Sequence, residues 1–150
     1  MASQAYSVLM SIYLKENPAY LRASLDSIIN QTIPPAEIVM VKDGPLTKEL
    51  DSVLAEYDRR YPGIFSFIAY EENHGLGYAL HRGMLACTND IVARMDTDDI
   101  ARSDRMEKQL KAIQDGLDMV GSQVIEFVES PDKPIARTDL PEGLNNIIAC

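Results

Sequence analysis

The sequence predicts a single α/β domain with a mainly parallel sheet and helices on both of its faces. Short apolar runs alternate along the chain with stretches whose apolar residues recur at helical spacing, and this alternation is typical of β-α-β units. Such units have right-handed connections and place successive strands parallel to one another. A length of 150 residues fits one domain with an adequate hydrophobic core.

The apolar runs predict five strands, and local start and stop signals predict the helices between them. The strands are expected at residues 6–13, 37–42, 64–70, 90–95 and, bulged or broken near 121–122, at 118–128. Asn17 and Thr47 have the features of N-cap residues, and Ser103 is expected to cap a later helix. A turn at 72–77 opens another helix. Proline or glycine ends three of the helices, at 34–35, 62–63 and 116.

Residues 129–150 have a different composition from the rest of the chain. Pro131, Pro134 and Pro141 interrupt a polar stretch that has no clear periodicity before residues 144–148. We therefore expect the α/β core to occupy residues 1–128. Residues 129–150 are expected to begin a further segment that is incomplete in this chain, because the chain stops at Cys150 without a helix-ending signal.

The charge of the chain limits its partners. A formal net charge of −9 argues against binding to nucleic acid or an anionic membrane through a basic surface. An anionic ligand remains compatible with this charge, since a bound divalent cation inverts the local sign. The two cysteines, Cys87 and Cys150, do not make a disulfide framework. With no signal peptide or membrane-length apolar run in the sequence, we expect a cytoplasmic protein.

A cluster of three carboxylates directly follows the strand predicted at 90–95: Asp96, Asp98 and Asp99. Carboxylates this close repel one another unless a cation or hydrogen-bond donors lie among them. Their hard oxygen atoms suit Mg²⁺ or Mn²⁺, which proteins commonly share with the phosphates of a substrate. The alternative interpretation is a solvated acidic turn that caps the next helix.

Polar or small residues stand at four predicted strand ends, at 11–13, 42–44, 71–77 and 96–99. The carboxyl ends of parallel strands meet at one edge of the sheet, where open α/β folds bind ligands. A binding crevice at this edge accounts for the four ends better than coincidence does. Two further side chains, His74 and Arg82, could contact a ligand there or lie on the surface.

Single residues at these ends have more than one interpretation. Asp43 could accept a hydrogen bond from a nucleobase or hold a ribose hydroxyl, or it could stabilise an Asp-Gly-Pro turn. Gly75 and Gly77 permit close approach of a ligand to the start of a helix, which makes Gly75 a candidate contact to a nucleotide. Arg94 lies on the same strand face as Asp96, so it could form a structural ion pair or position a substrate.

The order of these motifs resembles that of the family 2 glycosyltransferases with a GT-A fold, especially those of bacterial capsule and exopolysaccharide synthesis. The resemblance covers residues 6–128. Five motifs carry it at the expected separations: 8–13 (VLMSIY), 24–28 (SLDSI) with 31–32 (QT), 38–44 (IVMVKDG), 73–80 (NHGLGYAL) with 83 (G), and 93–99 (ARMDTDD). It implies a Rossmann-like GT-A sheet and transfer of a sugar from a nucleotide-diphosphate donor, with inversion at the anomeric carbon.

The resemblance also implies roles for individual residues. Ser11 and Tyr13 would lie where the first strand meets the nucleotide, and Asp43 would recognise the base. Asp96 and Asp98 match the two acids of the D-x-D motif. Asp96 would contact ribose or metal, and Asp98 would bind a Mn²⁺ or Mg²⁺ ion that bridges the diphosphate. Such a cation stabilises the charge that develops on the departing diphosphate.

The partners implied are a nucleotide-diphosphate sugar, expected to be a UDP-sugar, and a saccharide or lipid-linked saccharide acceptor of capsule, exopolysaccharide or O-antigen synthesis. Inverting transfer needs a general base, which the family carries in a later segment, so we expect it beyond residue 150.

The alternative is a non-catalytic fragment that binds nucleotide or self-associates. The face left open by truncation is expected to pair in a homodimer. The expected location is the cytoplasm or the inner face of the membrane.

Overall fold

The structure is a computed structural model and describes residues 5–138 of the chain. The chain divides into two compact units, Met1–Glu107 and Lys108–Cys150. No helix within the described range is long and apolar enough to cross a lipid bilayer. The candidate site residues all belong to the first unit.

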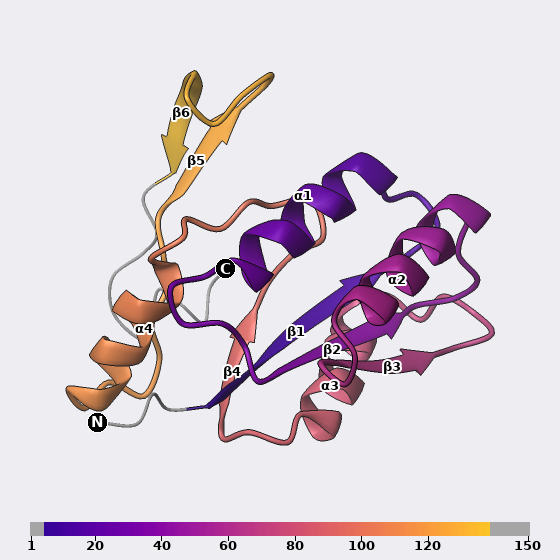
Figure 1. The fold of residues 1–150 in the computed structure, drawn as a ribbon, viewed down its shortest axis with the longest axis horizontal. Helices are drawn as coiled ribbons and strands as arrows, with labels where there is room; N and C mark the ends of the chain where they lie inside the picture. Colours follow the sequence, from indigo (N-terminus) through magenta and orange to yellow (C-terminus); the bar gives the residue numbers. More distant parts are fainter. Residues whose placement is uncertain (1–4, 139–150) are drawn as a thin grey trace. The chain divides into compact units, whose positions relative to one another are not determined.

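Four parallel strands form the sheet of the first unit, in the order β3-β2-β1-β4 (Figure 1). They are β1 (Tyr6–Ile12), β2 (Glu37–Lys42), β3 (Phe65–Ala69) and β4 (Ile91–Arg94). β1 is central: it pairs with β2 on one side and with β4 on the other. Each strand lies within one residue of its predicted bounds. The prediction of a parallel sheet is confirmed.

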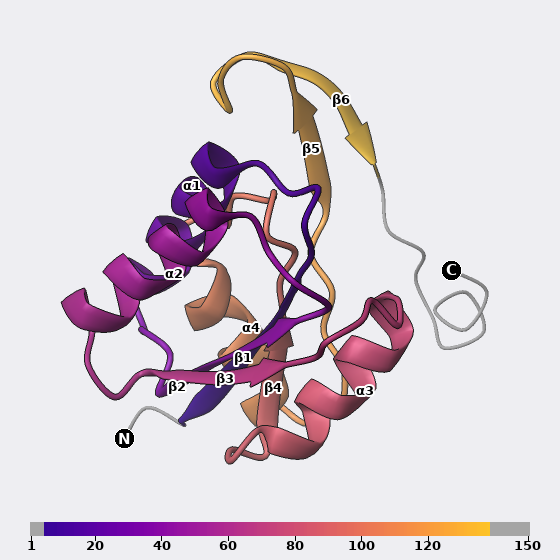
Figure 2. The same cartoon turned by 90° about the vertical axis from the view of Figure 1, so that its right-hand side faces the viewer.

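Helices cover both faces of this sheet, as predicted. α1 (Pro18–Ile29) and α2 (Lys48–Arg60) lie on one face, and α3 (Leu76–Ala86) lies on the other (Figure 2). Two of the three predicted N-caps, Asn17 and Thr47, are present, whereas the later helix begins at Arg105, two residues after Ser103, so Ser103 is not its N-cap residue. The Asn17 side chain accepts a hydrogen bond from the Ala19 amide at 2.8 Å, and the Thr47 hydroxyl accepts one from the Leu50 amide at 3.3 Å. These local signals therefore fix where α1 and α2 begin.

The core on the α3 side is made by Leu9, Val39 and Val41 of the sheet, packed against Ala79 of the helix. Gly83 allows this close packing. A Cβ atom at position 83 would lie 2.8 Å from Cγ2 of Val41 and would also overlap the Leu9 side chain. The helix can approach the sheet this closely only without a side chain at that position.

We expect Gly83→Ala to lower the free energy of unfolding by about 1–3 kcal/mol, because the added methyl group overpacks the core. Gly77→Ala, in the same helix, is the matched control, since a Cβ there has nothing within 4 Å. It should stabilise the protein by about 0.5–1 kcal/mol through its better helix propensity. Urea denaturation measures both values. Equal effects of the two substitutions would contradict this explanation.

The second unit contains a β-hairpin. α4 (Arg105–Gln114) crosses the boundary between the units, and β5 (Val124–Phe127) pairs antiparallel with β6 (Pro134–Thr138). The strand predicted at 118–128 is therefore too long, and β6 is absent from the predicted elements. Proline is tolerated at the first residue of a strand, so Pro134 reads as a break in the sequence although it begins β6. Residues 139–150 of the predicted final segment lie outside the described residues.

Candidate functional site

A cavity of about 390 Å³ opens at the carboxyl ends of β1, β2 and β4. This is the edge at which open parallel sheets bind ligands. The structure brings all six predicted site residues to this cavity. They line it together with five other residues: Ser11, Tyr13, Asp43, Gly75, Asp96 and Asp98, with Glu16, Asn73, Leu76, Arg94 and Thr97.

Asp43 joins the end of β2 to the loop that precedes α3. Its side chain is only 3% exposed, and its two carboxylate oxygens accept hydrogen bonds from the backbone amides of His74 at 2.8 Å and Gly75 at 2.9 Å. Gly75 has a φ of +90° and is the N-cap residue of α3. A backbone in this region favours glycine. The turn and the binding interpretations of Asp43 are therefore compatible, since each carboxylate oxygen can accept a further bond.

The acidic loop, which we define as residues 95–104 between β4 and α4, carries the predicted cluster of Asp96, Asp98 and Asp99. Asp96 follows the end of β4 and forms an ion pair with Arg94 at 2.7 Å, so the ion-pair interpretation of Arg94 is borne out. Asp98 is exposed at the cavity. Asp99 does not line the cavity. Burial, together with the negative charges of Asp96 and Asp98, raises the pKa of Asp99.

Glu16 is a cavity residue that the sequence interpretation missed. It follows β1 in the turn where its amide bonds the Tyr13 carbonyl at 3.2 Å. Burial raises the pKa of Glu16, and the negative charges of Asp98 and then Asp96 raise it further. Its position in the loop at a strand end is the signal that could have identified it. With Glu16, four carboxylates border the cavity, the others being those of Asp43, Asp96 and Asp98.

The cavity alone does not make a complete cation site. Within residues 5–138, no three His, Cys, Asp or Glu side chains lie close enough together to hold a metal ion by themselves. Magnesium and manganese are commonly bound by one or two carboxylates with the remaining ligands from water and substrate phosphates. The carboxylates at this cavity fit that arrangement.

His74 and Arg82 lie outside the cavity lining. The His74 ring packs against Tyr78, with ring centroids 4.8 Å apart, and against Tyr70 at 5.6 Å. The Arg82 guanidinium donates a hydrogen bond to the Tyr70 hydroxyl at 3.2 Å. The three rings form an aromatic cluster next to the loop that Asp43 holds, and Arg82 bonds to it.

The sequence matches a family model and several curated proteins. The model for glycosyl transferase family 2 matches residues 7–145. The amylovoran biosynthesis glycosyltransferase AmsE of Erwinia amylovora is 40% identical over 144 residues, covering 95% of this chain and 53% of the relative. The UDP-Gal:alpha-D-GlcNAc-diphosphoundecaprenol beta-1,3-galactosyltransferase of Escherichia coli is 42% identical over 135 residues, covering 88% and 48%. The chain spans about half the length of these relatives.

The fold matches solved glycosyltransferases with a GT-A fold. A mannosyltransferase of Pyrobaculum calidifontis, solved in complex with GDP-Man and Mn²⁺, superposes with a TM-score of 0.66 at 21% sequence identity. The match covers 77% of this chain and 34% of that chain. At this identity the likeness bears on the fold, and the GT-A prediction is confirmed.

Proposed function

The chain belongs to glycosyl transferase family 2, and from this premise we propose that its first unit binds the sugar donor of a polysaccharide-synthesising enzyme. The reaction proposed is transfer of a sugar from a nucleotide-diphosphate sugar to an acceptor hydroxyl, with inversion at the anomeric carbon. The observation that carries the proposal is the cavity, because residues from β1, β2, β4 and the loop before α3 line it together. Amylovoran synthesis by one relative supports the polysaccharide role.

Asp96 and Asp98 are the proposed ligands of a Mn²⁺ or Mg²⁺ ion. The Mn²⁺ in the solved mannosyltransferase complex supports a divalent cation in this fold. When bound, the cation stabilises the negative charge that develops on the departing diphosphate. Asp96 already pairs with Arg94, whereas Asp98 is exposed at the cavity, so we assign Asp98 as the main ligand.

The nucleotide is proposed to lie along the β1 and β2 ends of the cavity. Asp43 is held in one orientation by two backbone amides and offers its remaining lone pairs to a base imide. Ser11 and Tyr13 line the same region from β1, and Gly75 lines it without a side chain. The name of the galactosyltransferase relative supports a UDP-sugar as donor and a lipid-linked saccharide as acceptor.

The general base is proposed to lie in the part of the relatives that this chain does not span. The competing proposal is therefore a fragment that binds nucleotide, or pairs with a second copy, without turnover. Release of UDP from a UDP-sugar in the presence of a saccharide acceptor would exclude that alternative. Binding of the nucleotide without any turnover would support it. Light scattering tests the proposed homodimer.

Calorimetry of the chain with UDP and with GDP, in MnCl₂ and in EDTA, tests the donor site. We expect the affinity for the nucleotide to fall at least about tenfold when the cation is removed, because such cations are commonly held by protein carboxylates and substrate phosphates together. Absence of binding by both nucleotides to the folded chain would refute the donor-site proposal. Equal affinity in MnCl₂ and EDTA would refute the proposed metal ligands but not the nucleotide site.

A further inference from the structure

A row of polar residues on α1 and just after its C-terminal end binds the acidic loop and the start of α4. The row consists of Ser24, Ser27, Gln31 and Thr32, and we call it the tether row. Ser24, Ser27 and Gln31 follow one another at intervals of three and four residues, which places them on one side of a helical path. All four residues, and the backbone groups they bind, belong to the first unit.

The first two members bind the part of the loop that carries the aspartates. The Ser24 hydroxyl is fully buried and donates a hydrogen bond to the Asp96 carbonyl at 2.9 Å. The Ser27 hydroxyl accepts one from the Ala101 amide at 3.0 Å and donates one to the Ser24 carbonyl at 2.7 Å. The backbone on both sides of Asp98 is therefore fixed to α1.

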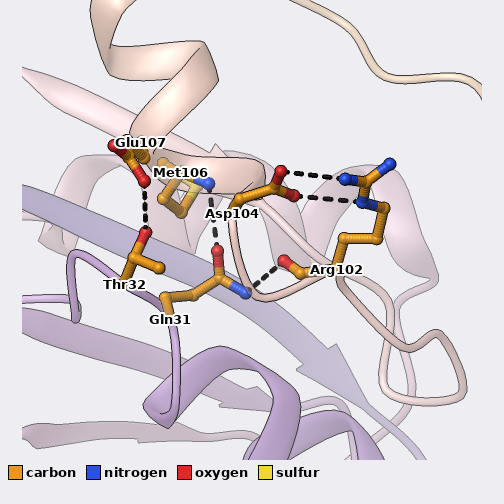
Figure 3. Close-up of polar contacts among 6 residues, drawn as sticks. All are labelled: Gln31, Thr32, Arg102, Asp104, Met106 and Glu107. Carbon is orange, nitrogen blue, oxygen red and sulfur yellow. Dashed lines mark hydrogen bonds and ion pairs between the residues drawn. The ribbon is translucent and has the colours of Figure 1, made fainter.

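Gln31 binds the end of the loop and the start of α4 (Figure 3). Its side chain is 5% exposed. The amide nitrogen donates hydrogen bonds to the Ser27 carbonyl at 2.8 Å and the Arg102 carbonyl at 2.7 Å, and the amide oxygen accepts one from the Met106 amide at 3.0 Å. One buried side chain thus supplies three bonds, one of them to an amide in the first turn of α4.

Thr32 adds two contacts next to those of Gln31. Its backbone amide donates to the Ser103 carbonyl at 2.8 Å, and its hydroxyl donates to the Glu107 carboxylate at 3.0 Å (Figure 3). The loop's backbone, which has no helix or strand of its own, is therefore bound by α1 at Asp96 and Ala101. The two residues just past the end of α1 that belong to the tether row bind it at Arg102 and Ser103.

We propose that the tether row positions the donor site: it holds the acidic loop in one conformation, so that Asp96 and Asp98 meet a metal-bound diphosphate without rearrangement. This inference rests on the proposed function, because it concerns the same carboxylates. A binding group that is already fixed before the ligand arrives loses less conformational freedom on binding. The tether row therefore contributes to affinity although none of its members lines the cavity.

Ser24→Ala and Gln31→Met test the proposal, with Tyr57→Phe as the matched control. The Tyr57 hydroxyl also bonds α1, through the Asp26 carboxylate at 2.7 Å and the Arg22 carbonyl at 3.2 Å, but it does not touch the acidic loop. We expect Ser24→Ala to weaken Mn²⁺-dependent UDP binding about fivefold and Gln31→Met at least about tenfold, from the loss of one bond and of three bonds. Tyr57→Phe should keep the wild-type affinity.

Two readouts separate positioning from general stability. Calorimetry in EDTA should give the same UDP affinity for Ser24→Ala as for the wild type, because the loss lies in the metal-dependent part of binding. Amide hydrogen exchange in residues 96–106 should be faster in Ser24→Ala and Gln31→Met and unchanged in Tyr57→Phe. A thermal melt of each variant confirms that it is folded, and Ser24→Ala decides the question if Gln31→Met does not fold.

Wild-type affinity in a folded Ser24→Ala variant would overturn the proposal, and so would an equal loss in Tyr57→Phe. The wild-type chain is itself the test of the proposed function. If it binds neither UDP nor GDP with Mn²⁺, the donor site is refuted, and with it the positioning of a donor. Exchange in residues 96–106 then decides only whether the tether row holds the loop, and an unchanged rate would refute that part as well.

Discussion

Asp98→Asn is expected to remove metal-dependent binding of a nucleoside diphosphate while leaving the fold intact. Asp98 is exposed, so the substitution leaves no buried partner without its charge. It keeps the size of the side chain and removes the anionic oxygen that a hard cation prefers. Loss of a residue that only supports a metal ligand typically lowers metal affinity about 10–100-fold, and loss of the ligand itself should cost more. We therefore expect the affinity for UDP in MnCl₂ to fall at least about 100-fold.

Asp58→Asn provides the matched control, because Asp58 is an exposed aspartate of α2 and the change in net charge is the same. The control should bind UDP and Mn²⁺ as the wild type does. NMR titration of the metal-free chain gives a second check. The charge of Asp98 contributes to the raised pKa values of Glu16 and Asp99, so both values should fall in Asp98→Asn. Unchanged metal dependence would remove Asp98 from the ligand set.

Much of the fold could be predicted because its signals are local. Asn17 before Pro18, and Thr47 before an amphipathic stretch, identify helix starts from a few adjacent residues. The strand at 37–42 is bounded by a proline pair and a Gly-Pro turn. The parallel order then places the strand ends at one edge, which is why the six candidate residues could be grouped before their positions were known.

Features that depend on distant residues could not be predicted in this way. The hydrogen bond from the Ser24 hydroxyl to the Asp96 carbonyl joins residues 72 positions apart, and that from the Met106 amide to the Gln31 side chain joins residues 75 apart. A serine on a helix, or a glutamine just after one, has the same local pattern whether it faces water or a loop. Glu16 was missed for a related reason, since its significance depends on its closeness to Asp98 and not on its own segment.

Asp43→Ala is expected to affect both stability and nucleotide binding. It removes the acceptors of two backbone amides, those of His74 and Gly75, at a side chain that is almost fully buried. Hydrogen bonds to a charged acceptor contribute more than neutral ones, so we expect the loss of both to lower the free energy of unfolding by about 2–4 kcal/mol. The loop before α3 should lose its fixed position, and the nucleotide its partner for the base. Urea denaturation measures the first effect and UDP calorimetry the second.

Asp43→Asn separates these two effects. It retains one acceptor oxygen but turns an NH₂ group toward the second amide, so stability should fall less than in Asp43→Ala. The loss of UDP affinity should be equal in MnCl₂ and in EDTA, whereas that of Asp98→Asn should appear only with the cation.

If Asp43 and Asp98 make independent contacts, the loss of binding free energy in the double variant should equal the sum of the two single losses within about 0.5 kcal/mol. A smaller combined loss would mean that both residues act on one shared loop conformation, and not on opposite ends of the donor.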